Sequence, residues 1–464
     1  METMDSDNLD NSDKIEQHVD ISGNTGDITV IGKIVLRVTR FIDERILKQL
    51  GWEQRVGFAL LMVAGIGATF FLHQTLQPRS PNRMAGDFRI AVAGFAEKEH
   101  SGDSEIGTEL AQGVYLQLEQ TFNEIETGFK VEIWGPDQVD ETVKGQNHDE
   151  GARSAAQVAE KIGADVLIYG WVDTTDVIWQ VTPEFYVSAD NFYEAEEVTG
   201  QHNLGAPFSV MGQGNIATRR EVSGEFTSRT RALARITVGL AYYSVRDFKT
   251  ALSFLQSAGE IQEWEDDEGK EVLYLLVGNA AGRIGDLELA RTYHQQALSL
   301  DPEYARAYVG LASVYYMSAL KPYEETGSPM KTDLNLLSLA ITTYKQAAQA
   351  AHQPPLSDIP VKVHFGLGQC YFMLVYSGNE ELFAPAIVEF EAVIEAHADG
   401  ANPRVLEMAA ESYARLGLIY DLSGHSNWAI ENYQKAASLL KDNPERQALY
   451  EGRAQAISDE TRGQ

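Results

Sequence analysis

One stretch, residues 271–304, most constrains what this chain can fold into. Apolar and small residues recur there on two successive helical faces, separated by a turn at Gly285-Asp286. Asp301-Pro302 ends the stretch, because proline cannot continue a helix and restricts the residue before it. A single helix–turn–helix unit cannot bury its own apolar face. The sequence therefore predicts several such units stacked on one another.

Four further units align with residues 271–304, one before this stretch and three after it. In chain order the five units predict an array over residues 232–458, ended by a polar-faced capping helix. The third and fourth units carry insertions, around 318–333 and 378–379. Small residues recur where helices would touch, among them Gly278 and Ala297. A bulky side chain at either position is expected to cost roughly 1–3 kcal/mol by overpacking.

The unit resembles a tetratricopeptide repeat, a 34-residue helix–turn–helix with small residues at its helix contacts. In that family, positions 2, 5, 9, 12 and 13 of each first helix line a concave groove that binds protein or peptide partners. The resemblance implies a partner-binding site made of Ile236, Tyr243, Leu275, Asn279, Arg283, Ser313, Tyr316, Phe365, Gln369, Phe372 and Met373. This groove is mostly apolar and aromatic, which suits a helical or extended apolar peptide better than a terminal carboxylate.

A membrane segment is predicted ahead of the array. Residues 56–76 contain no formal charge, although their most apolar part is at the short end of the length that spans a bilayer. Residues 33–55 have the basic, amphipathic pattern of a helix in a membrane interface, or of one packed on another domain. Five Lys/Arg residues lie in the twenty residues before the span and three in the twenty after it. This predicts a single-pass protein with a cytoplasmic N-terminus and extracytoplasmic C-terminal domains.

An α/β pattern occupies residues 87–199, between a linker at 77–86 and a connector at 200–231. Parallel strands and crossover helices are predicted, followed by an antiparallel strand over 177–187. The motifs Ile90-Ala-Val-x-x-Phe95 and Ala159-Glu-Lys-Ile-Gly-Ala-Asp-Val-Leu-Ile-Tyr-Gly-Trp-Val172 resemble a TolB amino-terminal-like domain. Such domains occur beside tetratricopeptide arrays in bacterial membrane signalling proteins.

Composition excludes several classes of function. The net charge of −31 argues against a nucleic-acid partner, because phosphates would be repelled. Residues 1–32 form an acidic stretch with few large apolar residues, which predicts a disordered tail. No motif for a metal or a catalytic nucleophile occurs, and Cys370 is expected to be a buried apolar residue. Gly212-Gln-Gly-Asn-Ile-Ala217 matches a dinucleotide-binding motif, but no strand and crossover helix are predicted around it, so it is interpreted as a chance match.

Together these patterns predict an α+β multidomain fold: a single transmembrane helix, a small α/β (TolB amino-terminal-like) domain and a C-terminal α-solenoid of about five tetratricopeptide repeats. The predicted function is a membrane-anchored, non-enzymatic adaptor or sensor that binds a protein or peptide in the repeat groove. Two alternatives stay open. The α/β domain binds a small molecule or has a catalytic role, or the repeats form a homo-oligomer that clusters membrane spans.

Overall fold

The first part of the fold is a mixed sheet. Strands β1 (Phe88–Val92), β3 (Val131–Trp134) and β4 (Val166–Asp173) run parallel, with β1 in the middle. The short strand β2 (Ala96–Glu97) also pairs with β4. This computed structural model describes residues 83–462, except 99–103, 140, 146, 176–177, 193–194, 206, 212–223, 262–263, 265–268, 356, 399–402 and 442.

Three antiparallel strands complete the sheet. Strand β5 (Ile178–Val187) pairs with β4, as the sequence predicted. Strands β6 (Gly200–Asn203) and β7 (Phe208–Met211) both pair with β5 and lie in the stretch predicted to be a connector. The sequence Gly-Gln-His-Asn of β6 has no apolar alternation, so the usual signal of a strand is missing there.

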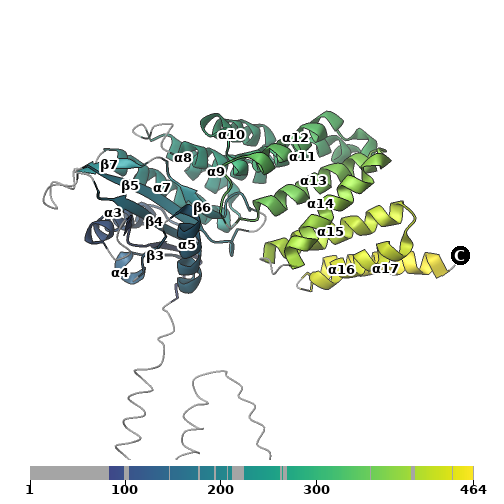
Figure 1. Cartoon of the computed structure of the whole chain (residues 1–464), viewed down its shortest axis with the longest axis horizontal. Helices are drawn as coiled ribbons and strands as arrows, with labels where there is room; N and C mark the ends of the chain where they lie inside the picture. The colour runs from purple at the N-terminus through teal and green to yellow at the C-terminus, as the bar shows by residue number, and fades with distance from the viewer. Residues whose placement is uncertain are drawn as a thin grey trace, which may run out of the picture. The chain divides into compact units, whose positions relative to one another are not determined.

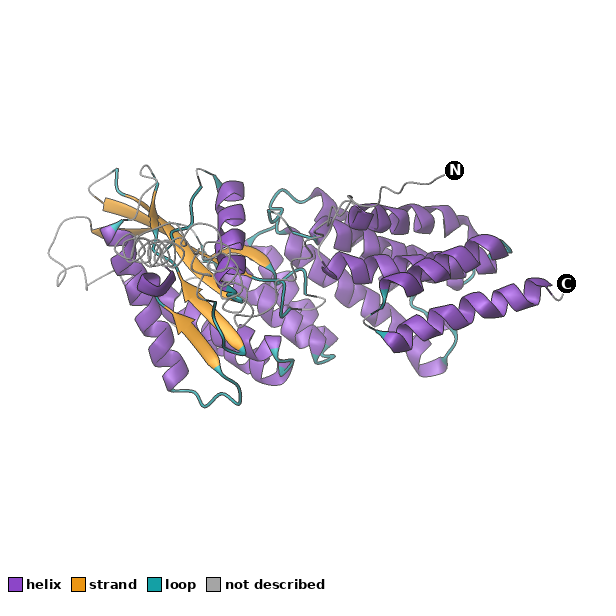
Figure 2. Cartoon of the chain, turned by 90° about the horizontal axis from the view of Figure 1, so that it is seen from below, coloured by secondary structure: helices purple, strands orange, loops and turns teal. Residues whose placement is uncertain are grey.

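Helices cover both faces of the sheet (Figure 2). Ile90 and Val92 pack against α3 (Glu105–Asn123), whereas Ala91 and Ala93 pack in the cluster that includes α5 (His148–Ile162). A short helix, α4 (Pro136–Val139), precedes α5. Because neighbouring side chains of a strand point to opposite faces, an apolar run such as that of β1 is buried on both sides.

The rest of the chain is a succession of antiparallel helix pairs (Figure 1). A final helix, α17 (Pro444–Arg462), packs on the last pair. The insertions lengthen α11 and add the turns η2 (Pro329–Lys331) and η3 (Glu380–Leu382). The pairs are α7 (Gly224–Ser244) with α8 (Phe248–Gly259), α9 (Lys270–Arg283) with α10 (Leu287–Leu300), α11 (Ala305–Thr326) with α12 (Leu334–Gln349), α13 (Ile359–Tyr376) with α14 (Phe383–Ala398), and α15 (Pro403–Leu422) with α16 (Ser426–Leu439).

Glycine lets the two helices of a pair approach closely. A Cβ atom at Gly368 of α13 would lie 2.8 Å from the Phe390 ring of α14, and one at Gly417 would lie 3.0 Å from the Tyr433 ring. Within the opening unit, Gly285 has a φ of +82°, a conformation that favours glycine in the turn between α9 and α10. The sequence pattern of small residues therefore corresponds to real helix contacts.

The sheet and the first helix pairs share one apolar core. Helix α3 packs against α7, and the Phe129 and Tyr242 rings meet edge to face with centroids 5.3 Å apart. The core cluster around β1 continues without a break to Ile236 and Leu275 of the first two pairs. Residues 81–464 accordingly form one compact unit.

The fold class and the localisation predicted from the sequence need correction. The expected transmembrane helix over 56–76 lies outside the described residues, as do the segments 1–32 and 33–55. No helix among the described residues is long and apolar enough to cross a membrane. The long helix α11, for example, carries Arg306, Lys321 and Glu324. This finding contradicts the predicted single-pass membrane protein, and the corrected fold class is a helical solenoid with a small sheet.

Two Gly→Ala substitutions test the helix contacts. Gly368→Ala is expected to lower the free energy of unfolding by about 1–3 kcal/mol, because the added Cβ would lie 2.8 Å from the fully buried Phe390 ring. Gly452→Ala is the control, since no atom lies within 4 Å of a Cβ there, and it is expected to raise stability by up to about 1 kcal/mol. Urea unfolding followed by helical circular dichroism measures both. Equal effects of the two substitutions contradict the proposed packing.

Candidate functional site

A cavity of about 600 Å³ lies against the first helices of successive pairs. Helices α9, α11, α13 and α15 each contribute lining residues, so the cavity follows the face on which the sequence placed the groove. Seven of the predicted groove residues line it, which are Tyr243, Asn279, Arg283, Ser313, Tyr316, Phe365 and Gln369.

The other four predicted residues are buried in the core. Ile236 and Leu275 are 0% exposed and belong to the same core cluster as Phe192, Ala195 and Val198 of the α/β part. Phe372 and Met373 are packed in the cluster that includes Leu416 and Ile419 of α15. Family position alone did not reveal that other parts of this chain would cover these side chains.

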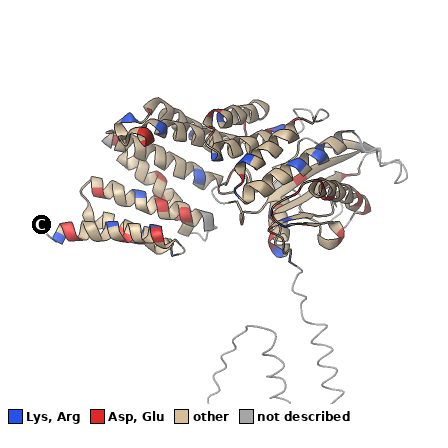
Figure 3. Cartoon of the chain, turned by 180° about the vertical axis from the view of Figure 1, so that it is seen from behind, with Lys and Arg blue, Asp and Glu red and all other residues tan. Residues whose placement is uncertain are grey.

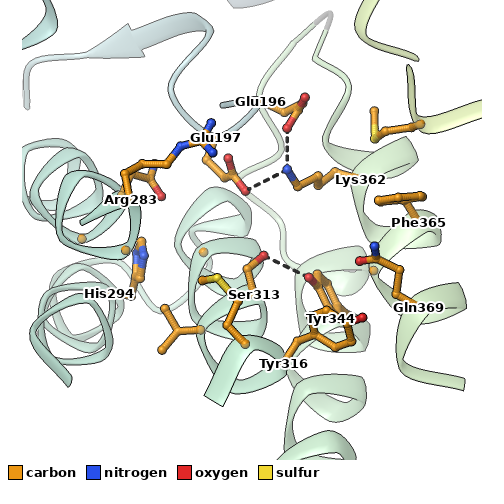
Figure 4. A pocket seen from close by; sticks show the side chains of 18 of the residues that line it. Glu196, Glu197, Arg283, His294, Ser313, Tyr316, Tyr344, Lys362, Phe365 and Gln369 are labelled. Carbon is orange, nitrogen blue, oxygen red and sulfur yellow. Dashed lines mark hydrogen bonds and ion pairs between the residues drawn. The ribbon is translucent and has the colours of Figure 1, made fainter. Parts of the chain in front are cut away.

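An acidic segment of the α/β part, residues 195–199, forms one rim of the cavity (Figure 4). The Lys362 Nζ atom lies 2.6 Å from Glu196 Oε2 and 3.8 Å from Glu197 Oε1. Burial alone lowers the pKa of Lys362, but the two carboxylates outweigh that effect and raise it. Lys362 therefore stays protonated, and the carboxylates of Glu196 and Glu197 balance its positive charge within the chain.

Arg306 joins the same stretch of the α/β part to the array. It is 1% exposed, and its guanidinium donates hydrogen bonds to the carbonyl oxygens of Glu197 at 2.7 Å, Thr199 at 2.6 Å and Gln201 at 2.9 Å. The His202 ring lies 3.0 Å from the same guanidinium, and burial lowers the pKa of His202 well below its ordinary value. No sequence pattern predicts this junction, because its two sides are far apart along the chain.

The floor of the cavity is formed partly by rings from second helices. His294 of α10 lies against Gly278 and Gly310, where added Cβ atoms would come within 2.8 and 2.3 Å of its ring. Tyr344 of α12 lies against Gly366, and its hydroxyl is 3.0 Å from Ser313 Oγ. Neither ring was predicted from the sequence to line the groove.

Burial sets the protonation of these rings. It lowers the pKa of His294 to about 3 and raises the pKa of Tyr344 above its ordinary value. His294 is therefore a neutral imidazole near pH 7. One of its ring nitrogens carries a proton and donates hydrogen bonds, and the other is a hydrogen-bond acceptor. The floor offers neutral hydrogen-bonding groups rather than charges.

The opposite rim carries carboxylates of α15. Glu411 accepts hydrogen bonds from Arg446 at 2.8 Å and from the Tyr450 hydroxyl at 2.9 Å, whereas Glu407 is exposed. Acidic and basic residues lie side by side along the helices of the array (Figure 3). The lining of the cavity likewise carries both signs, with Arg283, Lys362 and Arg446 beside four glutamates.

The described residues are not arranged for metal-ligand or thiol chemistry. Among the described residues, no group of three or more His, Cys, Asp or Glu side chains is placed to hold a metal ion. Cys370 is fully buried, as expected, and burial raises the pKa of its thiol. What the cavity offers is shape, apolar surface and hydrogen bonds.

Comparison with known families decides the nature of the helix pairs. A family model described as tetratricopeptide repeat matches residues 272–304 and 410–443. The chain contains tetratricopeptide repeats. The first matched segment coincides with residues 271–304 and the second with the last predicted unit before the capping helix, so tetratricopeptide repeats are confirmed at these two places. Their fold is one used for protein–protein interaction.

Several solved repeat proteins are similar to about half of this chain. TTC0263, a thermophilic TPR protein in Thermus thermophilus, has 16% identity and a TM-score of 0.34, over 48% of this chain and 99% of its own. YrrB, a TPR protein with an unusual peptide-binding site, has 18% identity and a TM-score of 0.32, over 48% and 92%. PilW, a type IV pilus biogenesis factor, has 14% identity and a TM-score of 0.34, over 48% and 92%.

No curated protein matches the chain. The family model covers repeat segments only, so the resemblance of residues 87–188 to a TolB amino-terminal-like domain is not supported. The predicted membrane and homo-oligomer partners have no support either.

The burial of His294 predicts a pH dependence of stability. Its folded pKa of about 3 is below the unfolded value of roughly 6.5, so the unfolded chain binds one more proton between these values. Stability is therefore fully present above pH 6.5 and falls on acidification, by roughly 1.4 kcal/mol per pH unit for this group. In His294→Gln, the free energy of unfolding should depend less steeply on pH between pH 6.5 and 5. The difference in slope should correspond to about one fewer proton taken up on unfolding. An unchanged slope in urea unfolding contradicts the burial of a neutral imidazole.

Arg306→Leu tests the junction. The substitution leaves the three carbonyl oxygens without their donor, and we expect a loss of about 3 kcal/mol or more in the free energy of unfolding. Arg453→Leu on the exposed face of α17 is the control and should change stability by less than about 0.5 kcal/mol. If Arg306→Leu behaves like the control in urea unfolding, the junction does not depend on this side chain.

Proposed function

We propose that this chain is a protein-binding adaptor whose repeat groove holds a peptide segment of a partner protein in the cavity of α9, α11, α13 and α15. The tetratricopeptide fold supports protein interaction in general. The observation that supports this particular site is the cavity itself, which is of a size typical of ligand pockets and lies on the groove face. A segment of a few residues fits a space of this volume.

The lining of the cavity favours a peptide with both apolar and polar groups. Phe365 and Val314 offer apolar surface, while Gln369 and Ser313 offer hydrogen bonds. The cations of the lining have partners within the chain, since Lys362 pairs with Glu196 and Arg446 with Glu411. A largely neutral peptide segment therefore suits the groove better than a strongly charged one.

A second candidate function belongs to the α/β part. A cavity of about 470 Å³ lies beside α5, lined by Lys144, Ser154 and Lys161 among others, and is compatible with a small-molecule ligand. Lys161 is paired with Glu141 on the same lining, however, and both side chains are partly exposed. The groove cavity, built from several repeats and supported by the fold, is the better candidate.

Selection of peptides tests the proposal. A random octapeptide library displayed on phage is enriched on the full chain, and the enriched peptides are synthesised for affinity measurement. Met317→Glu places a charge on the cavity lining at a side chain that is 38% exposed, so folding is not compromised. We expect the dissociation constant of the peptides to rise at least tenfold, which corresponds to about 1.4 kcal/mol.

The matched control is Met330→Glu. Met330 is 73% exposed and lies in η2, outside the cavity lining, so peptide affinity should stay within twofold of the unmodified chain. A library that yields no binding peptide, or two variants that weaken binding equally, contradicts a partner site in the groove.

A further inference from the structure

Two positions of the first helices that line the cavity, Gly310 and Gly366, have no side chain. A Cβ atom at Gly310 would lie 2.3 Å from His294 Cε1, and one at Gly366 would lie 2.2 Å from Tyr344 Cζ. Such distances are too short for any side chain, so glycine is required at both positions. As a result, rings that belong to the second helices α10 and α12 line the cavity.

The two rings differ in how their polar atoms are satisfied. The Tyr344 hydroxyl is hydrogen-bonded to Ser313 Oγ. His294, by contrast, is 1% exposed, and its Nδ1 atom has no hydrogen-bond partner among the described residues. The neighbouring Asn279 Nδ2 atom, which also lines the cavity, is likewise buried without a partner in the described part of the chain.

Unpartnered polar atoms are unfavourable in a folded protein. A buried donor or acceptor without a partner costs about 1–3 kcal/mol, and most buried polar groups are satisfied. Here the two atoms belong to residues of consecutive helices, α9 and α10, and both residues line one cavity. Figure 4 shows His294 below Arg283 on the side of the cavity across from Lys362 and Gln369. A ligand that supplies hydrogen-bond acceptors to these residues would remove that cost.

The chemistry of the two atoms defines the complementary group. An amide Nδ2 atom only donates hydrogen bonds, and a neutral imidazole donates through Nδ1 when the proton is on that nitrogen. The missing partner is therefore an oxygen that accepts hydrogen bonds. A carboxylate is disfavoured, because Glu196 and Glu197 already occupy the rim beside Lys362. A neutral carbonyl oxygen remains.

We propose that His294 and Asn279 form a polar subsite at the floor of the groove, which binds a neutral carbonyl oxygen of the partner peptide. The oxygen belongs either to a main-chain amide or to an Asn or Gln side chain of that peptide. The subsite rests on the proposed function, since it needs a peptide in the same cavity. It assigns a binding role to a second-helix residue, His294, that lies under the groove surface.

Two substitutions of His294 separate hydrogen bonding from packing. The side chain of Asn reaches the position of Nδ1, whereas that of Gln reaches the position of Nε2. With an enriched octapeptide and the full chain, His294→Asn keeps a donor at the position of Nδ1 and should therefore bind the peptide more tightly than His294→Gln does. His294→Gln should raise the dissociation constant about five- to tenfold, as expected for one lost hydrogen bond. Thermal melting confirms that both variants are folded.

Changes in the peptide identify the source of the oxygen. An ester in place of one main-chain amide weakens the carbonyl as an acceptor. If a main-chain oxygen is bound, one ester position weakens binding to the unmodified chain but not to His294→Gln. If a side-chain amide is bound, replacement of one Asn or Gln of the peptide by Ala shows the same coupling instead. Either coupling supports the subsite.

Other results overturn the subsite. If the octapeptide binds and Met317→Glu weakens it, but His294→Gln binds as tightly as His294→Asn, the subsite is wrong and the groove function stands. If only Asp or Glu substitutions in the peptide couple to His294, the bound oxygen is a carboxylate and the proposal is also wrong. If no peptide binds the unmodified chain, both the groove function and the subsite fail.

Discussion

Close approach of helices at glycine is the constraint on which this structure depends. At Gly368 and Gly417 it lets the two helices of one repeat pack ring against backbone, which makes each repeat a rigid unit. At Gly310 and Gly366 the same approach occurs between the second helix of one repeat and the first helix of the next. The array is stable through these contacts, and they also remove side chains from the groove. Close packing of rings against glycine therefore shapes both the solenoid and the floor of its cavity.

The α/β part determines how much of the groove is available. Its residues Phe192, Ala195 and Val198 pack on the first two repeats, and Arg306 and Lys362 hold the acidic segment in place. Buried charged groups of this kind are costly to desolvate, so their retention favours a role in fixing one arrangement. The cavity in the groove is bounded on one side by Glu196 and Glu197 of the α/β part.

The sequence predicted the repeats, the strands β1, β3, β4 and β5, and the face on which the cavity lies, because each has a clear period. Residues such as Tyr316 and Gln369 were found from repeat register alone. The same register placed Ile236 and Leu275 in the groove, whereas both are fully buried in the core cluster that the repeats share with the α/β part. His294 and Glu196 were missed, since only the folded chain brings a second-helix ring and a distant loop to one cavity. The membrane-spanning fold class, inferred from an apolar run, is contradicted among the described residues.

The central claim is that a partner peptide enters the cavity formed by the first helices of the repeats. The most direct measurement is a crystal structure of the full chain with an octapeptide enriched from the displayed library. The account predicts peptide density in the cavity, within contact distance of Ser313 and Phe365, with one carbonyl oxygen close to His294 Nδ1. Peptide density on the outer faces of the second helices, or beside α5, with the groove cavity left vacant, would contradict it.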